Sequence, residues 1–418
     1  MTSYKNKRVT VVGLARSGMA AARLLKQLGA HVSLTEKNDS AQLQDSARTL
    51  KEEGMDVELG GHSRSFIEGR DFLVISPGVP LDAEPVAWAR ELGIEVLSEI
   101  ELASSVCPAP IIAITGTNGK TTTTTLVSEV IKQAGFKAYC LGNIGTPFSQ
   151  SVLNIKKEDF VSLEVSSFQL ETIKEFHPKI AVILNLTPDH LDRHRDIQEY
   201  LEAKKRIYMN QGPQDWLILN YGDEALRRMA LEARPKVLFF NKDKSEGEFD
   251  QNQLAVLAVA KALSMDRGVC LEVFKNFKGV EHRMEFVKEL KGIEFINDAK
   301  STNIDSTIWA LRNIKKPAVL IAGGRDKGSN FRSMNDLIKD KVKFAVLVGE
   351  ASEKIARAWE GVLPFQQVKT FKEAVALAYR KAHAGDCVLF SPMCKSFDMF
   401  TDYEHRGRTF KEFVNKLT

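Results

Sequence analysis

The sequence predicts an α/β protein of three domains, each built around a mostly parallel sheet. The chain of 418 residues is long enough for about two to three domains. Short apolar runs with strand character alternate with helical patterns along its whole length. Many of these runs end in polar, glycine-bearing turns, where α/β sheets place their ligands. We expect a Rossmann-like domain over 1–98, a central P-loop ATPase-like domain over 99–280, and a Rossmann-like C-terminal domain over 281–418.

Composition and charge narrow the functional classes. A hydrophobic content of 44% and a charged content of 27% are ordinary for a soluble globular protein. The net charge is only +4 and no basic block stands out, so nucleic acid is not an expected partner. No apolar run approaches the ~18 residues of a membrane span, and no signal peptide is visible. The five cysteines are dispersed without a C-x-x-C pair, which favours reduced thiols and a cytoplasmic location.

The first segment reads as the opening βαβ unit of a Rossmann-like fold. A strand over 8–12 leads into a glycine-bearing turn over 13–18, a helix that ends at Gly29, and a second strand over 31–34. The turn is an incomplete dinucleotide motif, because Ala15 occupies the position where a glycine lets the backbone approach a diphosphate. An NAD(P)-linked oxidoreductase is therefore a weak alternative for this segment.

A second turn in this segment follows the strand over 72–75 and reads Ser76-Pro-Gly-Val-Pro80. A polar turn at the carboxyl end of a strand is a common ligand position in α/β folds. A plain Pro-Gly turn explains the same residues equally well.

The central segment opens with the strongest motif, a phosphate-binding loop. A buried strand over 111–114 runs into Gly116 and Gly119, and Lys120 and Thr121 then open a helix. Glycines let backbone N–H groups close around phosphate oxygens, the lysine reaches the terminal phosphates, and the threonine hydroxyl ligates Mg²⁺. The motif is incomplete, since an isoleucine replaces the first glycine. A strand–turn–helix joint with a surface lysine, or a nucleotide-binding switch protein, are the alternatives.

Two further strands of this segment bring candidate metal ligands. The strand over 160–165 carries Glu164, and the strand over 180–184 leads to His190, which lies between two aspartates. A carboxylate in so apolar a strand needs a partner, and Mg²⁺ bound to ATP prefers hard oxygen ligands. We expect both side chains near the phosphate loop. The helix over 197–210 contains Lys204-Lys-Arg206, which the residues alone indicate to be a solvated face.

The third segment predicts a second doubly wound domain. Strands over 284–287 and 293–296 form a hairpin, and the second strand runs into a polar joint over 297–303. Later strands end in similar joints at 323–328 and 391–396, rich in Lys, Asp and Ser. Because parallel strands share one carboxyl edge, these joints predict a binding site.

Taken in order, these motifs resemble the Mur ligases of bacterial peptidoglycan synthesis over nearly the whole chain. The motifs are GTNGKTT (116–122), GNIG (142–145), LEVSSFQLE (163–171), NLTPDHLDRH (185–194), AKKRIY (203–208), EHR (281–283), NDAKSTN (297–303), GGRDKG (323–328) and SPMCKSFDMF (391–400). SSFQLE and the SPxxxSFD pattern resemble the member that adds D-glutamate. The resemblance implies an ATP-dependent amide ligase that joins D-glutamate to UDP-N-acetylmuramoyl-L-alanine through an acyl phosphate. A sister ligase that adds another amino acid is the alternative.

The resemblance also implies roles for individual residues. Lys120, Glu164, His190, Lys204 and Lys300 would be catalytic. ATP would be bound by Gly116, Thr117, Asn118, Gly119, Lys120, Thr121, Thr122, Arg283 and Asp298. The UDP-linked substrate would contact Arg16, Ser17, Glu36, Lys37, Ser76, Asn143, Gln169 and His190. D-glutamate would contact Thr302, Lys327, Ser396 and Tyr403. Two Mg²⁺ ions are implied, held by Thr121 and by Glu164, His190 and Lys204, the lysine being carbamylated to N6-carboxylysine. Carbamylation reverses the interpretation of Lys204 as a solvated residue, because it converts an ammonium group into a hard anionic ligand.

The chain departs from the family pattern in one place. The stretch over 239–253 is short, and Phe249 and Asp250 stand where the family has a His-Asn pair that contacts adenosine. We therefore assign no adenine contact there. With nucleotide on the second segment and amino acid on the third, we expect the C-terminal domain to close on its substrates, and we expect a monomer.

Overall fold

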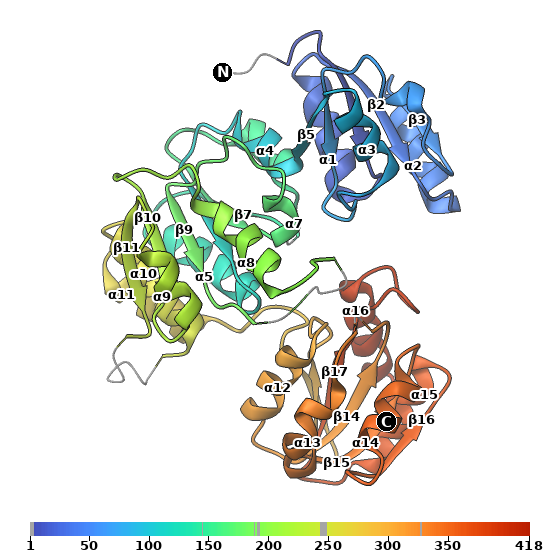
Figure 1. The fold of residues 1–418 in the computed structure, drawn as a ribbon. Coiled ribbons are helices and arrows are strands. Elements are labelled where there is room, and N and C mark those ends of the chain that lie inside the picture. The colour runs from blue at the N-terminus through green and yellow to red at the C-terminus, as the bar shows by residue number, and fades with distance from the viewer. Residues whose placement is uncertain (1–3, 144, 188, 190–192, 243–248, 327) are drawn as a thin grey trace. The chain divides into compact units, whose positions relative to one another are not determined.

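The computed structural model describes residues 4–418 except 144, 188, 190–192, 243–248 and 327 (Figure 1). Two compact units are present, one containing residues 1–188 and 193–277 and the other residues 189–192 and 278–418. Three sheets are distributed over these units, two in the first and one in the second. The predicted α/β class is confirmed. The domain boundaries at 98 and 280 remain a prediction.

The N-terminal sheet is parallel throughout, in the order β3-β2-β1-β4-β5 (blue in Figure 1). Its strands are β1 (Arg8–Val12), β2 (His31–Glu36), β3 (Asp56–Leu59), β4 (Phe72–Ile75) and β5 (Glu95–Ser98), and its helices are α1 (Arg16–Gln27), α2 (Ala41–Glu52) and α3 (Glu84–Glu91), followed by α4 (Glu99–Ser104). The apolar faces of α1 and α2 pack against one side of the sheet, and α3 packs against the other. Because β1 lies between β2 and β4, the turns that follow these three strands are neighbours.

The central sheet is also parallel, in the order β11-β10-β9-β6-β8-β7. The strands are β6 (Ile111–Thr115), β7 (Ala138–Gly142), β8 (Phe160–Glu164), β9 (Ile180–Ile183), β10 (Trp216–Asn220) and β11 (Lys236–Phe240). The helices are α5 (Lys120–Gln133), α6 (Phe148–Ser151), α7 (Ser167–Leu170), α8 (Ile197–Lys205), α9 (Glu224–Ala230), α10 (Gln251–Ala262) and α11 (Arg267–Asn276). Ile112 and Ile114 of β6 face α5 and α10, and Ala113 faces the opposite core.

Helix α5 accommodates its run of threonines by hydrogen bonding back to its own first turns. Thr124 Oγ1 donates to the carbonyl of Lys120 and Thr125 Oγ1 donates to that of Thr121, both at 2.8 Å. Thr123 and Thr124 are fully buried. These bonds give the threonine hydroxyls hydrogen-bond partners inside the helix, which buried polar groups require.

The C-terminal sheet is mixed, in the order β12-β13-β17-β14-β15-β16, with only β12 antiparallel (orange to red in Figure 1). Its strands are β12 (Glu285–Leu290), β13 (Ile293–Asn297), β14 (Ala318–Gly323), β15 (Val342–Leu347), β16 (Phe365–Gln367) and β17 (Cys387–Met393), and its helices are α12 (Ile304–Asn313), α13 (Asn335–Lys341), α14 (Ser352–Trp359), α15 (Phe371–Lys381) and α16 (Tyr403–Asn415). The predicted hairpin is confirmed as β12 and β13. Helices α12 to α14 cover one face, and α15 and α16 cover the other. Strands β13, β17 and β14 are adjacent, so the three polar joints share one edge.

Candidate active site

The phosphate loop follows β6, the strand flanked by β9 and β8, and its conformation requires its glycines. Gly116 has a φ of 148° and Gly119 has a φ of 83°, both in the region that favours glycine. A Cβ on Gly119 would lie 2.2 Å from Asn252 Oδ1, so the loop also has no room for a side chain there. Helix α5 begins at Lys120. Lys120 Nζ donates to the carbonyls of Gly116 and Thr117 at 2.8 and 2.7 Å.

The chain after β9 holds the loop from the side. Thr117 N–H donates to the carbonyl of Asn185 at 3.0 Å, and Asn118 N–H donates to Asn185 Oδ1 at 2.8 Å. Thr117 Oγ1 donates to the carbonyl of Thr187 at 3.0 Å. These contacts fix the loop against the neighbouring strand end and orient it before any nucleotide arrives.

Glu164 is the centre of the site. It ends β8 and is only 2% exposed. Its Oε2 accepts from Thr121 Oγ1 at 2.8 Å, and its Oε1 accepts from Asn143 Nδ2 at 2.9 Å. Three predicted residues from three elements are therefore brought together. The set offers a carboxylate and a hydroxyl at the start of a helix, and these hard oxygens suit Mg²⁺.

Lys204 also contacts the phosphate loop, and here the interpretation from residue types alone was wrong. Its side chain is 1% exposed, and Nζ donates to Thr115 Oγ1 at 3.2 Å and to the carbonyl of Gly116 at 3.0 Å. Nζ also lies 4.6 Å from the centre of the Tyr200 ring. A lysine is buried in this way only with partners, and its position agrees with a role at the loop.

The two residues after Lys204 differ from each other. Lys205 pairs with Glu232 at 2.6 Å and is partly exposed, as a solvated face requires. Arg206 instead donates to the carbonyls of Leu170 and Ile173 at 2.7 and 2.5 Å. The solvated interpretation was therefore wrong for Arg206 as well, because this side chain closes the turn that follows α7.

Gln169 lies in α7 and is 1% exposed. It forms a capping box with Ser166, in which Gln169 Oε1 accepts from the Ser166 N–H at 3.0 Å. Its Nε2 is buried without a hydrogen-bond partner among the described residues. An amide held in this way has a donor available for a ligand group.

At the N-terminal sheet, the turn after β1 is bound to a carboxylate from β2. Glu36 Oε2 accepts from the Leu14 N–H at 3.0 Å, and Ser76 Oγ donates to the carbonyl of Gly13 at 3.2 Å. A Cβ on Gly18 would lie 1.9 Å from the Gly13 oxygen, so this glycine is needed for close packing. Glu36 and Ser76 thus meet at one turn.

Three further residues predicted for the UDP-linked substrate are more exposed. Arg16 and Lys37 are exposed and Ser17 is half-buried. Arg16 Nη1 lies 3.5 Å from the carbonyl of Gly145, in the loop that also carries Asn143. This long contact brings the predicted UDP residues toward the loop beside Glu164.

In the C-terminal unit, Asp298 is buried within a network of donors. It is 1% exposed, and its carboxylate accepts from the Met284 N–H at 3.2 Å, from Ser391 Oγ at 2.8 Å and from Ser301 Oγ. Burial raises the pKa of the Asp298 carboxyl, and the nearby Arg283 guanidinium opposes that rise. The ATP-binding residues predicted here, Arg283 and Asp298, are thus electrostatic neighbours.

Other predicted residues of this unit lie near the same edge. Lys300 Nζ lies 5.1 Å from the centre of the Tyr403 ring, which opens α16. Ser396 is 3% exposed and follows β17, and Thr302 is half-buried after β13. The joint residues thus line the ends of adjacent strands. His190 and Lys327 lie outside the described residues.

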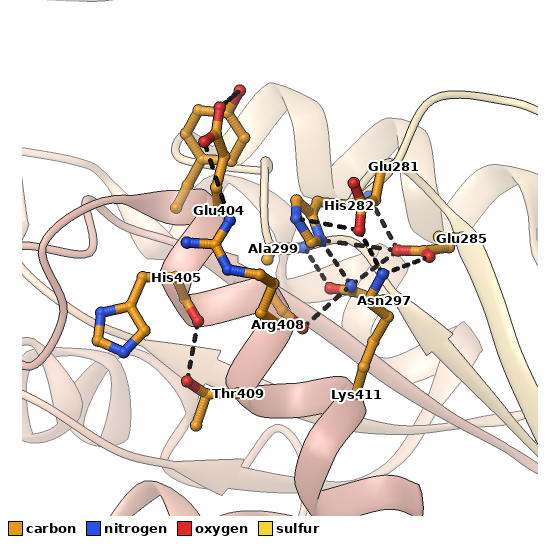
Figure 2. Close-up of polar contacts among 12 residues, drawn as sticks. Glu281, His282, Glu285, Asn297, Ala299, Glu404, His405, Arg408, Thr409 and Lys411 are labelled. Carbon is orange, nitrogen blue, oxygen red and sulfur yellow. Dashed lines mark hydrogen bonds and ion pairs between the residues drawn. The ribbon is translucent and has the colours of Figure 1, made fainter. Parts of the chain in front are cut away.

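His282 anchors α16 against this edge, as Figure 2 shows. Its Nδ1 accepts from Asn297 Nδ2 at 2.9 Å, which requires a neutral imidazole acceptor, and burial lowers its pKa. A Cβ on Gly407 would lie 2.3 Å from His282 Nδ1. The carboxylates of Glu281 and Glu285, which flank His282, both pair with the Lys411 ammonium group of α16, so these ion pairs also attach the helix to this edge.

Sequence reasoning missed Arg406. Its side chain is 2% exposed, and Nη2 donates to the carbonyls of Ala299 and Cys394 at 2.8 and 3.1 Å. Burial lowers its pKa to about 10. Helical periodicity in the sequence could have indicated this burial, because Arg406, Phe410 and Val414 are spaced four residues apart and share the buried face of α16.

In the stretch that departs from the family pattern, the described residues from Phe249 onward contain the capped start of α10. Asp250 accepts from the Gln253 N–H at 2.9 Å, and Gln253 Oε1 accepts from the Asp250 N–H. Phe249 packs edge-on against Phe274. Both side chains therefore have partners inside the protein, Asp250 in the helix cap and Phe249 in an aromatic pair. This agrees with assigning neither of them an adenine contact.

Family comparisons agree with these motifs. The model of the MurD-like N-terminal domain of Mur ligases matches residues 7–98, the Mur ligase middle domain matches 114–286, and the Mur ligase glutamate ligase domain matches 282–394. Among solved structures, UDP-N-acetylmuramate-alanine ligase MurC from Thermotoga maritima has a TM-score of 0.63 at 18% identity, over 98% of this chain and 99% of that one. MurF from Acinetobacter baumannii has a TM-score of 0.59 at 15% identity, over 92% and 91%. These structures show the fold alone.

Sequence relatives carry more information than the solved structures. The UDP-N-acetylmuramoylalanine–D-glutamate ligase of Caldanaerobacter subterraneus subsp. tengcongensis is 40% identical over 445 residues, covering 99% of each chain. The enzyme of the same name from Koribacter versatilis is 41% identical and covers 99% of this chain and 98% of its own. With three consecutive domain models matched and relatives of this identity along the full length, the chain belongs to the Mur ligase family.

Proposed function

We propose that this protein is an ATP-dependent ligase that joins D-glutamate to UDP-N-acetylmuramoyl-L-alanine in peptidoglycan synthesis. The observation that carries the proposal is the buried carboxylate of Glu164, hydrogen-bonded to Thr121 at the start of a phosphate-loop helix. This arrangement supports phosphoryl transfer from ATP. The relatives named as D-glutamate ligases support the choice of amino acid.

The reaction has two steps. The alanyl carboxylate attacks the γ-phosphorus of ATP, the bond to the β-phosphate oxygen breaks, and ADP leaves. The amine of D-glutamate then attacks the acyl carbon, loses a proton, and displaces phosphate. There is little covalent chemistry for the protein, which orients the reactants and neutralises charge. We assign this role to Lys120, Lys300 and Arg283, which supply positive charge.

Mg²⁺ would neutralise charge on the transferring phosphoryl group. We propose two Mg²⁺ sites, the first at the Thr121 hydroxyl and the second held by Glu164, His190 and Lys204. The oxygens of Thr121 and Glu164 suit this hard cation. Lys204 fits only as a carbamate, because its ammonium form repels a cation. Its burial beside the loop agrees with such a modification.

Substrate recognition follows the same reasoning. We propose that Thr302, Lys327, Ser396 and Tyr403 bind D-glutamate, whose carboxylates require cations and hydroxyls. The residues proposed for the UDP-linked substrate are Arg16, Ser17, Glu36, Lys37, Ser76, Asn143, Gln169 and His190. We propose that the protein is a monomer. We also propose that it is located in the cytoplasm, where ATP and UDP-linked substrates are available. Among the described residues, no helix has the length and apolar character needed to cross a bilayer.

The test is a coupled assay of ADP formation with Mg²⁺, ATP, UDP-N-acetylmuramoyl-L-alanine and a panel of amino acids. We expect ADP only when the muramoyl acceptor and D-glutamate are both present. Turnover with L-alanine or diaminopimelate in place of D-glutamate would identify a sister ligase. ATP turnover that ignores the acceptor would contradict the proposal.

A further inference from the structure

Arg193 contacts the turn that follows β4. Its Nη1 donates to the carbonyls of Pro77 and Gly78 at 3.4 and 3.3 Å, and Nη2 donates to that of Val79 at 3.3 Å. The individual hydrogen bonds are long. Three carbonyl dipoles nevertheless converge on one delocalised cation, which is the arrangement a planar guanidinium suits. This turn directly follows Ser76, which contacts the turn after β1.

The planar face of the same guanidinium lies on an aromatic ring. Arg193 Cζ is 4.2 Å from the centre of the Phe168 ring, within the range of a cation–π contact. Phe168 in turn stacks on His194, with ring centres 5.4 Å apart and an interplanar angle of 15°. Phe168 precedes Gln169, so the stack restrains the turn of α7 that holds the Gln169 amide.

The stack continues to the phosphate loop. His194 meets the edge of the Tyr200 ring at 5.3 Å, and Tyr200 Oη lies 3.2 Å from Thr117 Oγ1. Ser167 Oγ is hydrogen-bonded to His194 Nε2 at 3.0 Å, which fixes the imidazole. A continuous series of packed groups thus runs from the turn after β4 to the ATP loop.

We propose that Arg193 is a positioning residue for the acceptor substrate, one that holds the turn at 77–79 against the helical turn carrying Gln169. The inference rests on the proposed function, because it takes both turns to face the UDP-linked substrate. Arg193 holds both segments in place before the substrate binds. Without it, substrate binding must order them, and this entropic cost weakens binding. The nucleotide loop has its own anchors at Asn185 and is affected less.

The test compares Arg193→Ala, Arg193→Lys and Phe168→Leu with the wild-type full chain in the D-glutamate-dependent ADP assay. We expect Arg193→Ala to raise the KM for UDP-N-acetylmuramoyl-L-alanine about tenfold while the KM for ATP stays within about twofold. Arg193→Lys should recover part of the loss, because it keeps the charge without the planar stack. Arg193→Ala and Phe168→Leu together should cost less than the product of their separate effects, because they remove one shared contact.

Arg195→Ala is the matched control. Arg195 lies two residues away, is 85% exposed and pairs only with Glu199 among the described ion pairs, so its KM values should equal those of the wild type. Equal increases in both KM values, or an Arg193→Ala enzyme identical to Arg195→Ala, would overturn the inference. If the alanine variant does not fold, the same comparison is made with Arg193→Lys, whose KM for UDP-N-acetylmuramoyl-L-alanine should rise more than its KM for ATP. Failure of the wild type to form ADP would refute the proposed function instead.

Discussion

Replacing Glu171 with glutamine is expected to stabilise the protein at alkaline pH and to change nothing at pH 4.5. Glu171 ends the SSFQLE motif, its side chain is 18% exposed, and its Oε1 lies 3.7 Å from His194 Nδ1. Burial raises its pKa from 4.5 to about 7, although Arg193 opposes the rise. Between these two values the folded protein binds a proton that the unfolded chain has lost. Stability therefore falls as pH rises through this window, and the cost is complete above pH 7.

The size of the effect follows from the shift. One pKa unit corresponds to ~1.4 kcal/mol, so ionised Glu171 costs the fold at most about 3.5 kcal/mol. Glutamine has the same shape without the charge, so the variant avoids this cost. At roughly 2 °C per kcal/mol, Tm of Glu171→Gln should exceed the wild-type Tm by about 5 °C at pH 8.

The measurement is thermal unfolding of both proteins from pH 4.5 to 8.5, followed by scanning calorimetry or near-UV circular dichroism. The difference in Tm should grow between about pH 5 and pH 7 and then level off. Glu175→Gln is the control, because it makes the same chemical change at an exposed side chain four residues away. A Tm difference that is the same at pH 5 and pH 8 would show that Glu171 is not buried at a raised pKa.

Three further predictions concern the site and its support. Glu164→Gln should lower kcat by roughly 10²–10³-fold in the ADP assay, because a neutral amide removes the charge next to the transferring phosphoryl group; an active variant would remove the carboxylate from the mechanism. Lys204→Ala should lose most activity and regain part of it with added short carboxylic acids, which would replace the proposed carbamate; no rescue would point to an unmodified lysine. Gly407→Ala should destabilise the protein by about 1–3 kcal/mol in thermal unfolding, since its new Cβ would meet the His282 ring. Gly212→Ala, whose Cβ would meet nothing nearer than 4.0 Å, should not.

Patterns of neighbouring residues were sufficient for the parts of the site that lie within one strand and its turn. The phosphate loop, the position of Glu164 and the β12–β13 hairpin were all visible in short stretches, because strand sterics and glycine geometry are local. The family resemblance added the function. The surroundings of Lys204 and Arg206 could not be predicted in this way, since the carbonyls to which their side chains donate lie more than thirty positions away in the chain.

The amino-acid sequence by itself determined the α/β class, the order of the motifs and the chemistry that they carry, because periodicity and turn chemistry depend on residues close together in the chain. Only the tertiary structure decided which distant groups meet. Glu164 contacts Thr121 and Asn143, Lys204 is buried beside the loop, and Arg193 contacts a turn more than a hundred residues away in the chain. Sheet order brings these groups together, and sheet order depends on how whole strands and helices pack rather than on any local pattern.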